Sequence, residues 1–461
     1  MLQLSFSEQN SSQPLYQQLY GAIVQQIRQK QLLPGEKLPG KRRLAVALSV
    51  SVNTVDTAYQ MLVAEGYLQA RPKSGFFVQE YVGPIGEPPA AIPLPSSTPP
   101  PTFAYDLSTG GIDTGLFPFR TWGRIQKELL YSQPQLLNRG HPQGDEDLRC
   151  AIAQYLRAYR AVDCTPEQIV VGAGVEYLLG LLAHLVEGPV AVEDPGYRRT
   201  QQILNNSGID CIPLPIDSHG LDASLLRQTD ANLVYVTPSH QFPTGAVMPA
   251  GRRAALLQWA MEHPGRFILE DDYDSEFRFD LRPLPSLQGM AGSGGPVVYL
   301  STFSRSLAPS IRIAYMVLPQ TLLRRFQSDF SSYSSTVSRF EQQTLRIFLE
   351  DGHFVRHLAR CRNQYRSRMQ TLTTALNQCL GADTLQFSGQ HTGLHLLMTR
   401  KGNLSEAELL RRAANAGVKL SGLSEYCFHV TPAPSTLVLG YGALNPAQIQ
   451  HLAQLLCRIW Q

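Results

Sequence analysis

A stretch dense in proline divides this 461-residue chain into two unequal parts. It carries eight prolines among small residues and almost no charge: Pro84, Pro88, Pro89, Pro93, Pro95, Pro99, Pro100 and Pro101. Proline fixes φ and lacks a backbone donor, so this stretch favours an extended, semi-stiff spacer over a helix or a strand. The sequence therefore predicts a small domain over residues 1–80, a linker over 81–104 and a large domain over 105–461.

Composition limits what these domains can be. Hydrophobic residues make up 43% of the chain, as in ordinary folded proteins. No apolar run is long enough to span a bilayer, and the first residues lack the features of a secretory signal, so we expect a cytoplasmic protein without a membrane partner. The seven cysteines are scattered and never form a CxxC pair, which favours reduced thiols over disulfides or a metal site.

The net charge of +3 comes from the small domain alone. Residues 1–80 contain eight Lys/Arg and five Asp/Glu, which leaves 32 residues of each sign in the rest of the chain. A polyanion is therefore expected to dock on the small domain.

The small domain has the pattern of a helix-turn-helix followed by a hairpin. Apolar residues every four positions from Leu15 to Ile27 predict an amphipathic helix over 15–30. A short helix is predicted to open within 38–45, residues 48–50 form a tight turn, and a second short helix covers 51–62. Residues 66–78 predict a β-hairpin. This order is that of a winged helix-turn-helix, which reads duplex DNA.

These motifs resemble the GntR family of bacterial regulators over residues 12–79. The resemblance implies that the second helix of the motif enters the major groove and that the hairpin tip approaches the minor groove. It assigns DNA contacts to six residues: Lys41, Arg42, Asn53, Thr54, Lys73 and Gly75. Val52 stands where the family usually has arginine, which removes a phosphate contact. Each basic residue taken alone also fits an ordinary solvated surface, but the order of the elements favours DNA binding.

The large domain alternates apolar, β-rich runs with helical stretches. Strands are predicted at 169–172, 189–193, 233–237, 267–269 and 297–300, and the stretches between them include helices at 176–185 and 252–262. Such alternation predicts an α/β fold with a parallel sheet. Beyond about residue 320, helices over 341–350 and 354–380 lead to a shorter α+β tail.

Polar motifs follow several of these strands, where ligands of α/β sheets bind. Gly174 and Val175 open a helix after a strand, an arrangement whose free N–H groups hold a phosphate. Tyr197 offers a ring that can stack on a pyridine face, and Asp271 offers a carboxylate for a pyridinium nitrogen. Taken singly, Asp271 also fits a helix N-cap or a solvated loop, and Tyr197 fits the core. The other polar candidates are Arg199, His240, Tyr273, Thr302, Ser304, Arg305 and Arg312.

In this order the motifs resemble fold-type I aminotransferases, and the whole chain resembles the MocR/GabR subfamily of GntR regulators. The resemblance implies a winged helix-turn-helix ahead of an aminotransferase-like domain with a mainly parallel sheet and a small α+β C-terminal subdomain. It also implies a domain-swapped homodimer and a pocket for pyridoxal 5′-phosphate (PLP). In that pocket Tyr273 would donate to the phenolate oxygen, Arg312 would bind the phosphate and Arg199 would contact a small-molecule effector.

Arg305 departs from this pattern, because the subfamily has its Schiff-base lysine at this position. A guanidinium keeps its proton and offers no lone pair to attack an aldehyde. Ser435 and Thr436 also stand where transaminases have an arginine for the substrate carboxylate. The sequence therefore predicts a transcriptional regulator that binds PLP non-covalently, or a related phosphate or amine ligand, without transaminase turnover.

Two alternatives stay open. A working aminotransferase with an appended DNA-binding domain needs another lysine, and the large domain offers only Lys127, Lys401 and Lys419, none of them in a pocket motif. A regulator whose large domain is only a dimerising scaffold would bind no ligand there.

Overall fold

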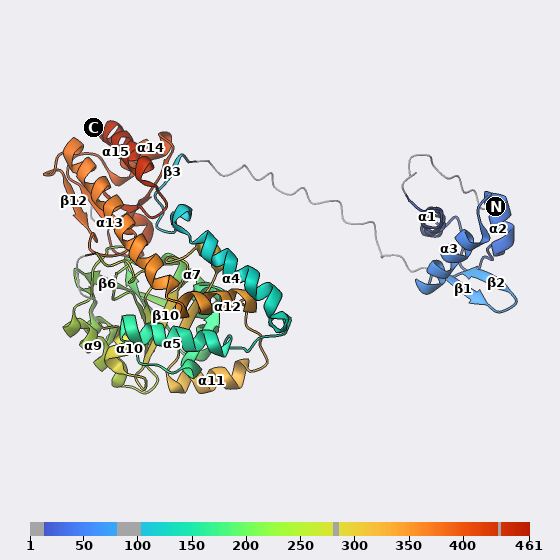
Figure 1. Cartoon of the computed structure of the whole chain (residues 1–461), viewed down its shortest axis with the longest axis horizontal. Coiled ribbons are helices and arrows are strands. Elements are labelled where there is room, and N and C mark those ends of the chain that lie inside the picture. Colours follow the sequence, from blue (N-terminus) through green and yellow to red (C-terminus); the bar gives the residue numbers. More distant parts are fainter. Residues whose placement is uncertain (1–12, 81–102, 280–284, 432–434) are drawn as a thin grey trace. The chain divides into compact units, whose positions relative to one another are not determined.

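The computed structural model describes residues 13–80, 103–279, 285–431 and 435–461. The chain forms two compact units, Met1–Pro100 and Pro101–Gln461 (Figure 1). The boundary between them falls inside the stretch predicted as a linker, most of which lies outside the described residues. Each unit is described below by itself.

Within residues 13–80 the N-terminal unit contains three helices and an antiparallel hairpin: α1 (Leu15–Arg28), α2 (Lys41–Leu48), α3 (Val52–Ala64), β1 (Leu68–Arg71) and β2 (Gly75–Val78). The four-residue spacing of α1 places Leu19, Ile23 and Ile27 in the unit's core. Helix α2 ends at Ser49, which adopts the left-handed conformation. Helix α3 begins directly afterwards, because the Ser51 side chain accepts the Thr54 N–H as an N-cap. The predicted winged helix-turn-helix is confirmed.

The central sheet of the second unit has, among the described residues, eight strands in the order β4-β11-β10-β9-β8-β5-β6-β7. They are β4 (Ile169–Gly172), β5 (Val190–Asp194), β6 (Cys211–Asp217), β7 (Gly220–Leu221), β8 (Leu233–Val236), β9 (Phe267–Asp271), β10 (Val297–Thr302) and β11 (Ala314–Val317). The run from β10 to β6 is parallel, whereas β11 is antiparallel to both its neighbours and β7 is antiparallel to β6. The predicted α/β fold with a mainly parallel sheet is therefore confirmed.

Helices cover both faces of this sheet, so its central strands are buried throughout. Along β10, Val298 and Leu300 face one way and Val297 and Tyr299 the other, as the two-residue period of a strand requires. The first pair shares a core with α6 (Val175–Leu185) and α11 (Gln320–Phe330). The opposite face packs against α4 (Phe119–Ser132), α5 (Glu146–Arg160), α8 (Ala223–Leu226), α9 (Ala250–Met261), α10 (Leu287–Ala291) and α12 (Arg339–Glu350).

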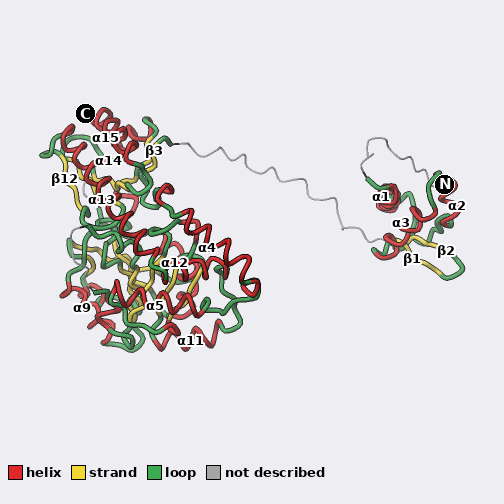
Figure 2. The backbone as a smooth tube through the Cα atoms, in the orientation of Figure 1, coloured by secondary structure: helices red, strands yellow, loops and turns green. Residues whose placement is uncertain are grey.

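The C-terminal subdomain is built on an antiparallel sheet in the order β12-β13-β16-β15. Its strands are β12 (Leu385–Ser388), β13 (His395–Arg400), β15 (Ser421–Gly422) and β16 (Thr436–Gly440). Its helices are α13 (His353–Leu380), α14 (Glu406–Asn415) and α15 (Pro446–Trp460). Figure 2 labels one of its strands, β12, and its helices α13, α14 and α15. A short parallel pair, β3 (Tyr105–Asp106) with β14 (Val418–Lys419), ties the start of this unit to the subdomain. This is the small α+β subdomain that the sequence predicts.

The cysteines correct one prediction. Cys379 of α13 and Cys457 of α15 form a disulfide, with their Cα atoms 6.0 Å apart, so the expectation of reduced thiols alone is wrong for this pair. They are separated by 78 residues, and only the packing of two helices brings them together, which no local motif reveals. The other five cysteines are free. In the part of the chain that the structure describes, no helix has the length and apolarity needed to cross a bilayer.

Candidate functional site

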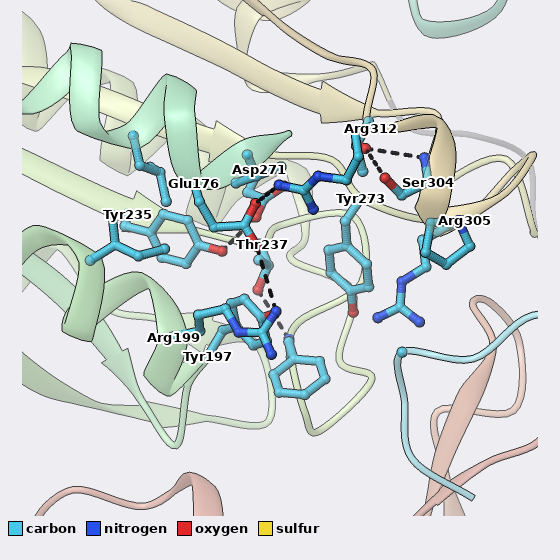
Figure 3. Close-up of a pocket in the computed structure, with 17 residues that line it drawn as sticks. Glu176, Tyr197, Arg199, Tyr235, Thr237, Asp271, Tyr273, Ser304, Arg305 and Arg312 are labelled. Atoms are coloured by element: carbon cyan, nitrogen blue, oxygen red, sulfur yellow. Dashed lines mark hydrogen bonds and ion pairs between the residues drawn. The ribbon is translucent and has the colours of Figure 1, made fainter. Parts of the chain in front are cut away.

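A cavity of about 180 Å³ opens at the carboxyl ends of the parallel strands (Figure 3). This volume is many times the roughly 15 Å³ that one water requires, so the cavity has room for a small ligand. Nine of the residues predicted for a ligand site line it: Val175, Tyr197, Arg199, Asp271, Tyr273, Thr302, Ser304, Arg305 and Arg312. These residues lie at the ends of four strands, β4, β5, β9 and β10, or in the connections that follow them, and they converge on one site.

One end of the cavity is formed by the start of helix α6. Gly174, the N-cap residue, has a φ of 95°, and a Cβ there would lie 2.2 Å from Nη2 of Arg312. Only glycine therefore fits, and the first N–H groups of α6 lack partners within their own helix. Arg312 donates to Oε2 of Glu176 over 2.7 Å and to the Ala173 carbonyl over 3.1 Å, and Arg199 lies 3.5 Å from the other Glu176 oxygen. This end of the cavity therefore has two guanidinium groups and a helix N-terminus but only one carboxylate. The surplus of positive charge favours the binding of an anion there.

Asp271, at the end of β9, also lines the cavity. Its Oδ2 accepts from the Tyr235 hydroxyl over 2.5 Å, whereas its buried Oδ1 has no hydrogen-bond partner among the described residues. Burial, reinforced by the negative charges of Asp272 and Asp274, raises the pKa of Asp271 to about 7. A buried carboxylate oxygen with an open lone pair needs a donor, and a protonated ring nitrogen of a ligand would supply one.

Two aromatic residues, Tyr197 and Tyr273, also line the cavity. The Tyr197 ring packs edge-on against Phe242, with their centroids 5.2 Å apart. Tyr273 differs from expectation in one respect, because its hydroxyl donates to the backbone carbonyl of His240 over 2.9 Å. The proton expected to reach a ligand's phenolate oxygen is therefore committed to the protein.

His240 lies behind the cavity wall rather than in it. It is 1% exposed, its Nδ1 lies 3.0 Å from the Asp274 carboxylate, and its ring stacks on that of Tyr273. His240, Asp274 and His395 could together offer three ligand atoms to a metal ion. The His395 Nε2, however, already lies 3.2 Å from the Pro243 carbonyl. His240 thus supports Tyr273 from behind, and Asp274 and His395 contact His240 in turn. Phe242, two residues after His240, lines the cavity in its place.

Thr302 and Ser304 line the cavity but bond to each other. The Thr302 hydroxyl donates to the Ser304 hydroxyl over 2.8 Å and accepts the Ser304 N–H over 3.1 Å. This local turn starts the segment that carries Arg305. It orients the segment without requiring a ligand.

Arg305 is half-buried and makes no hydrogen bond or ion pair with any residue that the structure describes. Its guanidinium carbon lies 6.0 Å from the centroid of the Tyr273 ring. Figure 3 shows Arg305 on the Tyr273 side of the cavity, apart from the cluster of Arg199, Glu176 and Arg312. The positive charge of Arg305 opposes the burial effects that raise the pKa of Asp271 and of Tyr197. The cavity therefore contains a cation without a counter-ion.

Eight lining residues were not among the predicted site residues, and four of these have polar or aromatic side chains: Glu176, Tyr235, Thr237 and Phe242. Glu176 resembles an ordinary first-turn acid of a helix, so only its pairing with Arg312 reveals its place. Tyr235 did leave a signal, because it is a hydroxyl-bearing residue in an otherwise aliphatic buried strand and needs a partner there. Thr237 is held by the buried Glu193, whose pKa burial raises to about 7.

Ser435 and Thr436 lie outside the cavity lining. Ser435 donates to the Leu404 carbonyl over 2.5 Å, and the Thr436 hydroxyl lies 2.9 Å from that of Thr399 in the C-terminal sheet. Both hydroxyl groups are engaged in bonds that hold the subdomain together.

The six predicted DNA contacts fall into two groups. Arg42, Asn53 and Lys73 are exposed. Lys41 is paired with Asp56 and lies over the Phe76 ring, Thr54 bonds to the Ser51 cap, and Gly75, with a φ of 110°, shapes the hairpin tip. The first group is free to meet a ligand, and the second keeps the recognition elements in shape.

Comparison with known proteins matches each unit to a family. Residues 105–456 match "Aminotransferase class I and II" and residues 15–78 match "Bacterial regulatory proteins, gntR family". The first match covers more than half of the chain. Both units therefore have a family assignment that agrees with the fold described above.

Curated relatives share the whole architecture. The chain is 38% identical to the HTH-type transcriptional regulator YdeL of Bacillus subtilis, over 97% of each chain. It is 35% identical to the probable rhizopine catabolism regulatory protein MocR of Rhizobium meliloti, over 95% of this chain and 92% of the relative. Among solved structures, it resembles LysN, an α-aminoadipate aminotransferase of Thermus thermophilus complexed with N-(5′-phosphopyridoxyl)-L-leucine. That likeness has a TM-score of 0.66 and 26% identity and covers 77% of this chain and 91% of LysN. The chain therefore belongs to the aminotransferase class I and II family and, with its gntR-type domain, is a MocR-type HTH transcriptional regulator.

Proposed function

We propose that this regulator binds duplex DNA as a homodimer and senses PLP, or a related phosphate, held non-covalently in its aminotransferase-like unit without turnover. The proposal depends on which residue stands on the Tyr273 side of the cavity. Arg305 stands there, and none of the described residues that line the cavity is a lysine.

The cavity residues fit PLP as a ligand. Gly174 puts no side chain over the start of α6, and Arg312 lies beside it, which suits a phosphate at the helix N-terminus. The unsatisfied Oδ1 of Asp271 suits a protonated pyridine nitrogen, and the Tyr197 ring suits stacking on the pyridine face. When bound to an enzyme, PLP supplies an electron sink for reactions of amino acids.

The groups that transaminase turnover requires, an amine for the Schiff base and an arginine for the substrate carboxylate, are replaced by other residues. Arg305 offers no nucleophilic amine, since a guanidinium stays protonated in proteins. Lys419 pairs with Asp106 in the short β3–β14 sheet, and neither Lys127 nor Lys401 lines the cavity. With Ser435 and Thr436 where a substrate-carboxylate arginine is expected, these features support binding without catalysis.

The DNA-binding half of the proposal rests on the gntR-type unit and its exposed residues Arg42, Asn53 and Lys73. A helix-turn-helix dimer reads two half-sites related by its own symmetry. The large unit would supply that symmetry, and a ligand that alters the dimer would alter the spacing of the two DNA-binding units.

Borohydride reduction followed by intact-mass spectrometry tests the central claim. Wild-type protein incubated with PLP should gain no cofactor mass, although equilibrium dialysis should detect bound phosphate ligand. Arg305→Lys should gain one cofactor mass, because a primary amine then stands in the cavity. A reducible adduct in a wild-type tryptic peptide would support the working aminotransferase instead, and absence of binding by both proteins would support the scaffold.

A further inference from the structure

We infer that the cavity selects a ligand with two anionic groups, a phosphate at the α6 end and a carboxylate at Arg305. The ligand class is a pyridine phosphate that carries a carboxylate, either on the ring or on a group attached to the ring, where PLP has its aldehyde. This inference rests on the proposed function, since it assigns a ligand to the same cavity.

The α6 end of the cavity already has the positive charge that a phosphate needs. Arg312 and Arg199 share the single carboxylate of Glu176, and the N-terminus of α6 adds partial positive charge. A phosphate bound there would meet two guanidinium groups and backbone donors. This end therefore accounts for one anion and leaves Arg305 without one.

No protein group of the described chain neutralises Arg305. The Tyr273 ring offers only its π face, and its hydroxyl already donates to the His240 carbonyl. The Oδ2 of Asp271 accepts the Tyr235 hydroxyl. Burial raises the pKa of Asp271 to about 7, so this carboxyl takes up a proton near neutral pH. A half-buried cation without a partner is unfavourable, and a ligand carboxylate would supply the missing charge.

The shape of guanidinium decides which ring substituent fits. An aldehyde is neutral and offers a single acceptor, and an aminomethyl group is cationic and would be repelled. A carboxylate is planar, carries two acceptors and pairs with the fork of an arginine through two parallel hydrogen bonds. Arg305 thus favours an acid at the position where a lysine would favour an aldehyde.

Two sources share this chemistry. The carboxylate can be attached to the ring itself, as in 4-pyridoxic acid 5′-phosphate. Alternatively, it can belong to an amino acid joined to the ring, as in the N-(5′-phosphopyridoxyl)-L-leucine bound by LysN. Probes of both kinds separate the two sources.

Isothermal titration calorimetry of the full-length protein tests the inference with four non-condensing probes. Pyridoxine 5′-phosphate is neutral at the critical substituent and pyridoxamine 5′-phosphate is cationic. The two acids named above each carry a carboxylate, which in the leucine adduct stands beside a protonated secondary amine. We expect at least one acid to bind about tenfold or more tightly than pyridoxine 5′-phosphate, as an arginine–carboxylate pair gains over a neutral contact, and pyridoxamine 5′-phosphate to bind most weakly. The acid that binds more tightly identifies the source.

Two variants locate the effect. Arg305→Met should abolish the preference for acids and leave the affinity for pyridoxine 5′-phosphate within about threefold, because the phosphate contacts remain. Arg312→Met is the matched control, since it should weaken all four probes by a similar factor and keep their ratios. Arg305→Lys retains a positive charge and should keep part of the preference. Circular dichroism checks that each variant is folded.

The outcomes separate the inference from the proposal beneath it. Equal binding of acid and alcohol probes to the wild type, or an acid preference that survives in Arg305→Met, would overturn the two-anion ligand and leave a phosphate site standing. Failure of every phosphate to bind wild type and variants alike would remove the ligand site of the proposed function as well.

Discussion

The two units of this regulator present their functional residues in opposite ways. In the N-terminal unit Arg42, Asn53 and Lys73 are exposed, and their positions are fixed by short-range bonds such as the Ser51 cap. In the C-terminal unit the candidate ligand groups are buried or half-buried, and two of them, Asp271 and Arg305, lack a complete set of partners. The difference follows from the size of what each unit would bind.

A duplex is a large, solvated polyanion, and cations gain from it by releasing counter-ions at a surface. Such residues need only be exposed and correctly spaced. A small ligand gains affinity from groups already withdrawn from water whose bonding capacity is open. The comparison predicts that substitutions in one unit change one binding reaction and spare the other.

The largest effect should come from Gly174→Ala. A Cβ there would overlap the Arg312 guanidinium and force residue 174 into a strained left-handed backbone. Loss of the arginine contact removes a charge-assisted bond of about 1.5–3 kcal/mol, so affinity for pyridoxine 5′-phosphate should fall roughly 10- to 150-fold. Calorimetry measures this loss. Gly180→Ala, within α6 and with nothing within 4 Å of its Cβ position, is the control and should leave the affinity unchanged.

The next effect lies in the other unit and compares two adjacent cations. Arg42→Ala should lower the salt dependence of DNA binding, the slope of log K against log[salt], by about 0.9. Lys41→Ala should change that slope less, since the Lys41 ammonium is already paired with Asp56. Fluorescence anisotropy with a labelled duplex between 50 and 200 mM salt measures both. Equal slopes for the two variants would contradict this division of roles, and ligand binding should be unchanged in each.

Much of the fold could be predicted from the sequence, because its signals are local. Strand β4 was predicted with the bounds that the structure gives it, and β5, β8 and helix α6 differ by a residue at one or both ends. The antiparallel β11 could not be foreseen from pattern alone, since a buried run of four apolar residues has no direction. The disulfide of Cys379 and Cys457 also depends on helix packing, which no spacing encodes.

The candidate site likewise has residues that could be proposed from their positions in the sequence and others whose roles depend on tertiary contacts. Tyr197 directly precedes a helix and Asp271 ends β9, so both could be proposed from their positions, whereas Arg312, which lies between a 3-10 turn and β11, was assigned from the family resemblance. His240 was misplaced because the loop 237–245 folds back through the buried Gln241, which puts Phe242 in the wall. The commitment of the Tyr273 hydroxyl to His240 likewise depends on a tertiary bond.

Another effect concerns folding stability rather than binding, and it sharpens the contrast between buried and exposed acids through pH. The folded pKa of Asp271 is about 7, above its ordinary 3.8, so the folded state keeps a proton that the unfolded state loses. The contribution of Asp271 to stability is therefore present below pH 3.8 and is lost as pH rises to about 7, at up to roughly 1.4 kcal/mol per pH unit. Asp271→Asn should flatten this part of the stability profile.

Tryptophan fluorescence suits the measurement, because Trp122, Trp259 and Trp460, the three tryptophans of the chain, all belong to the large unit. Urea unfolding between pH 4.5 and 8 gives the profile for wild type and variant. Asp56→Asn is the matched control, since this exposed acid pairs with Lys41 in the other unit, which lowers its pKa. A profile that Asp271→Asn leaves unchanged would show that Asp271 is ionised when the protein is folded.

The smallest expected effect is a gain, from Val52→Arg. Val52 is the first residue of α3 and is 47% exposed beside Asn53, so an arginine there would reach a phosphate without disturbing the core. Its charge is unfavourable at a helix N-terminus by about 0.3–1 kcal/mol, but arginine favours helix more than valine does, which offsets part of this cost. The salt slope of DNA binding should steepen by about 0.9, with a several-fold rise in affinity at low salt.

Val46→Arg adds the same charge on α2, where the valine is 80% exposed, and tests whether position matters. If α3 is the element that meets the duplex, Val52→Arg should steepen the slope more than Val46→Arg. Equal gains would mean that binding responds to net charge alone, and the contrast between a shaped surface and a merely basic one would fail for this unit. In either variant the calorimetric affinity for pyridoxine 5′-phosphate should stay that of the wild type, because the cavity residues all lie in the other unit.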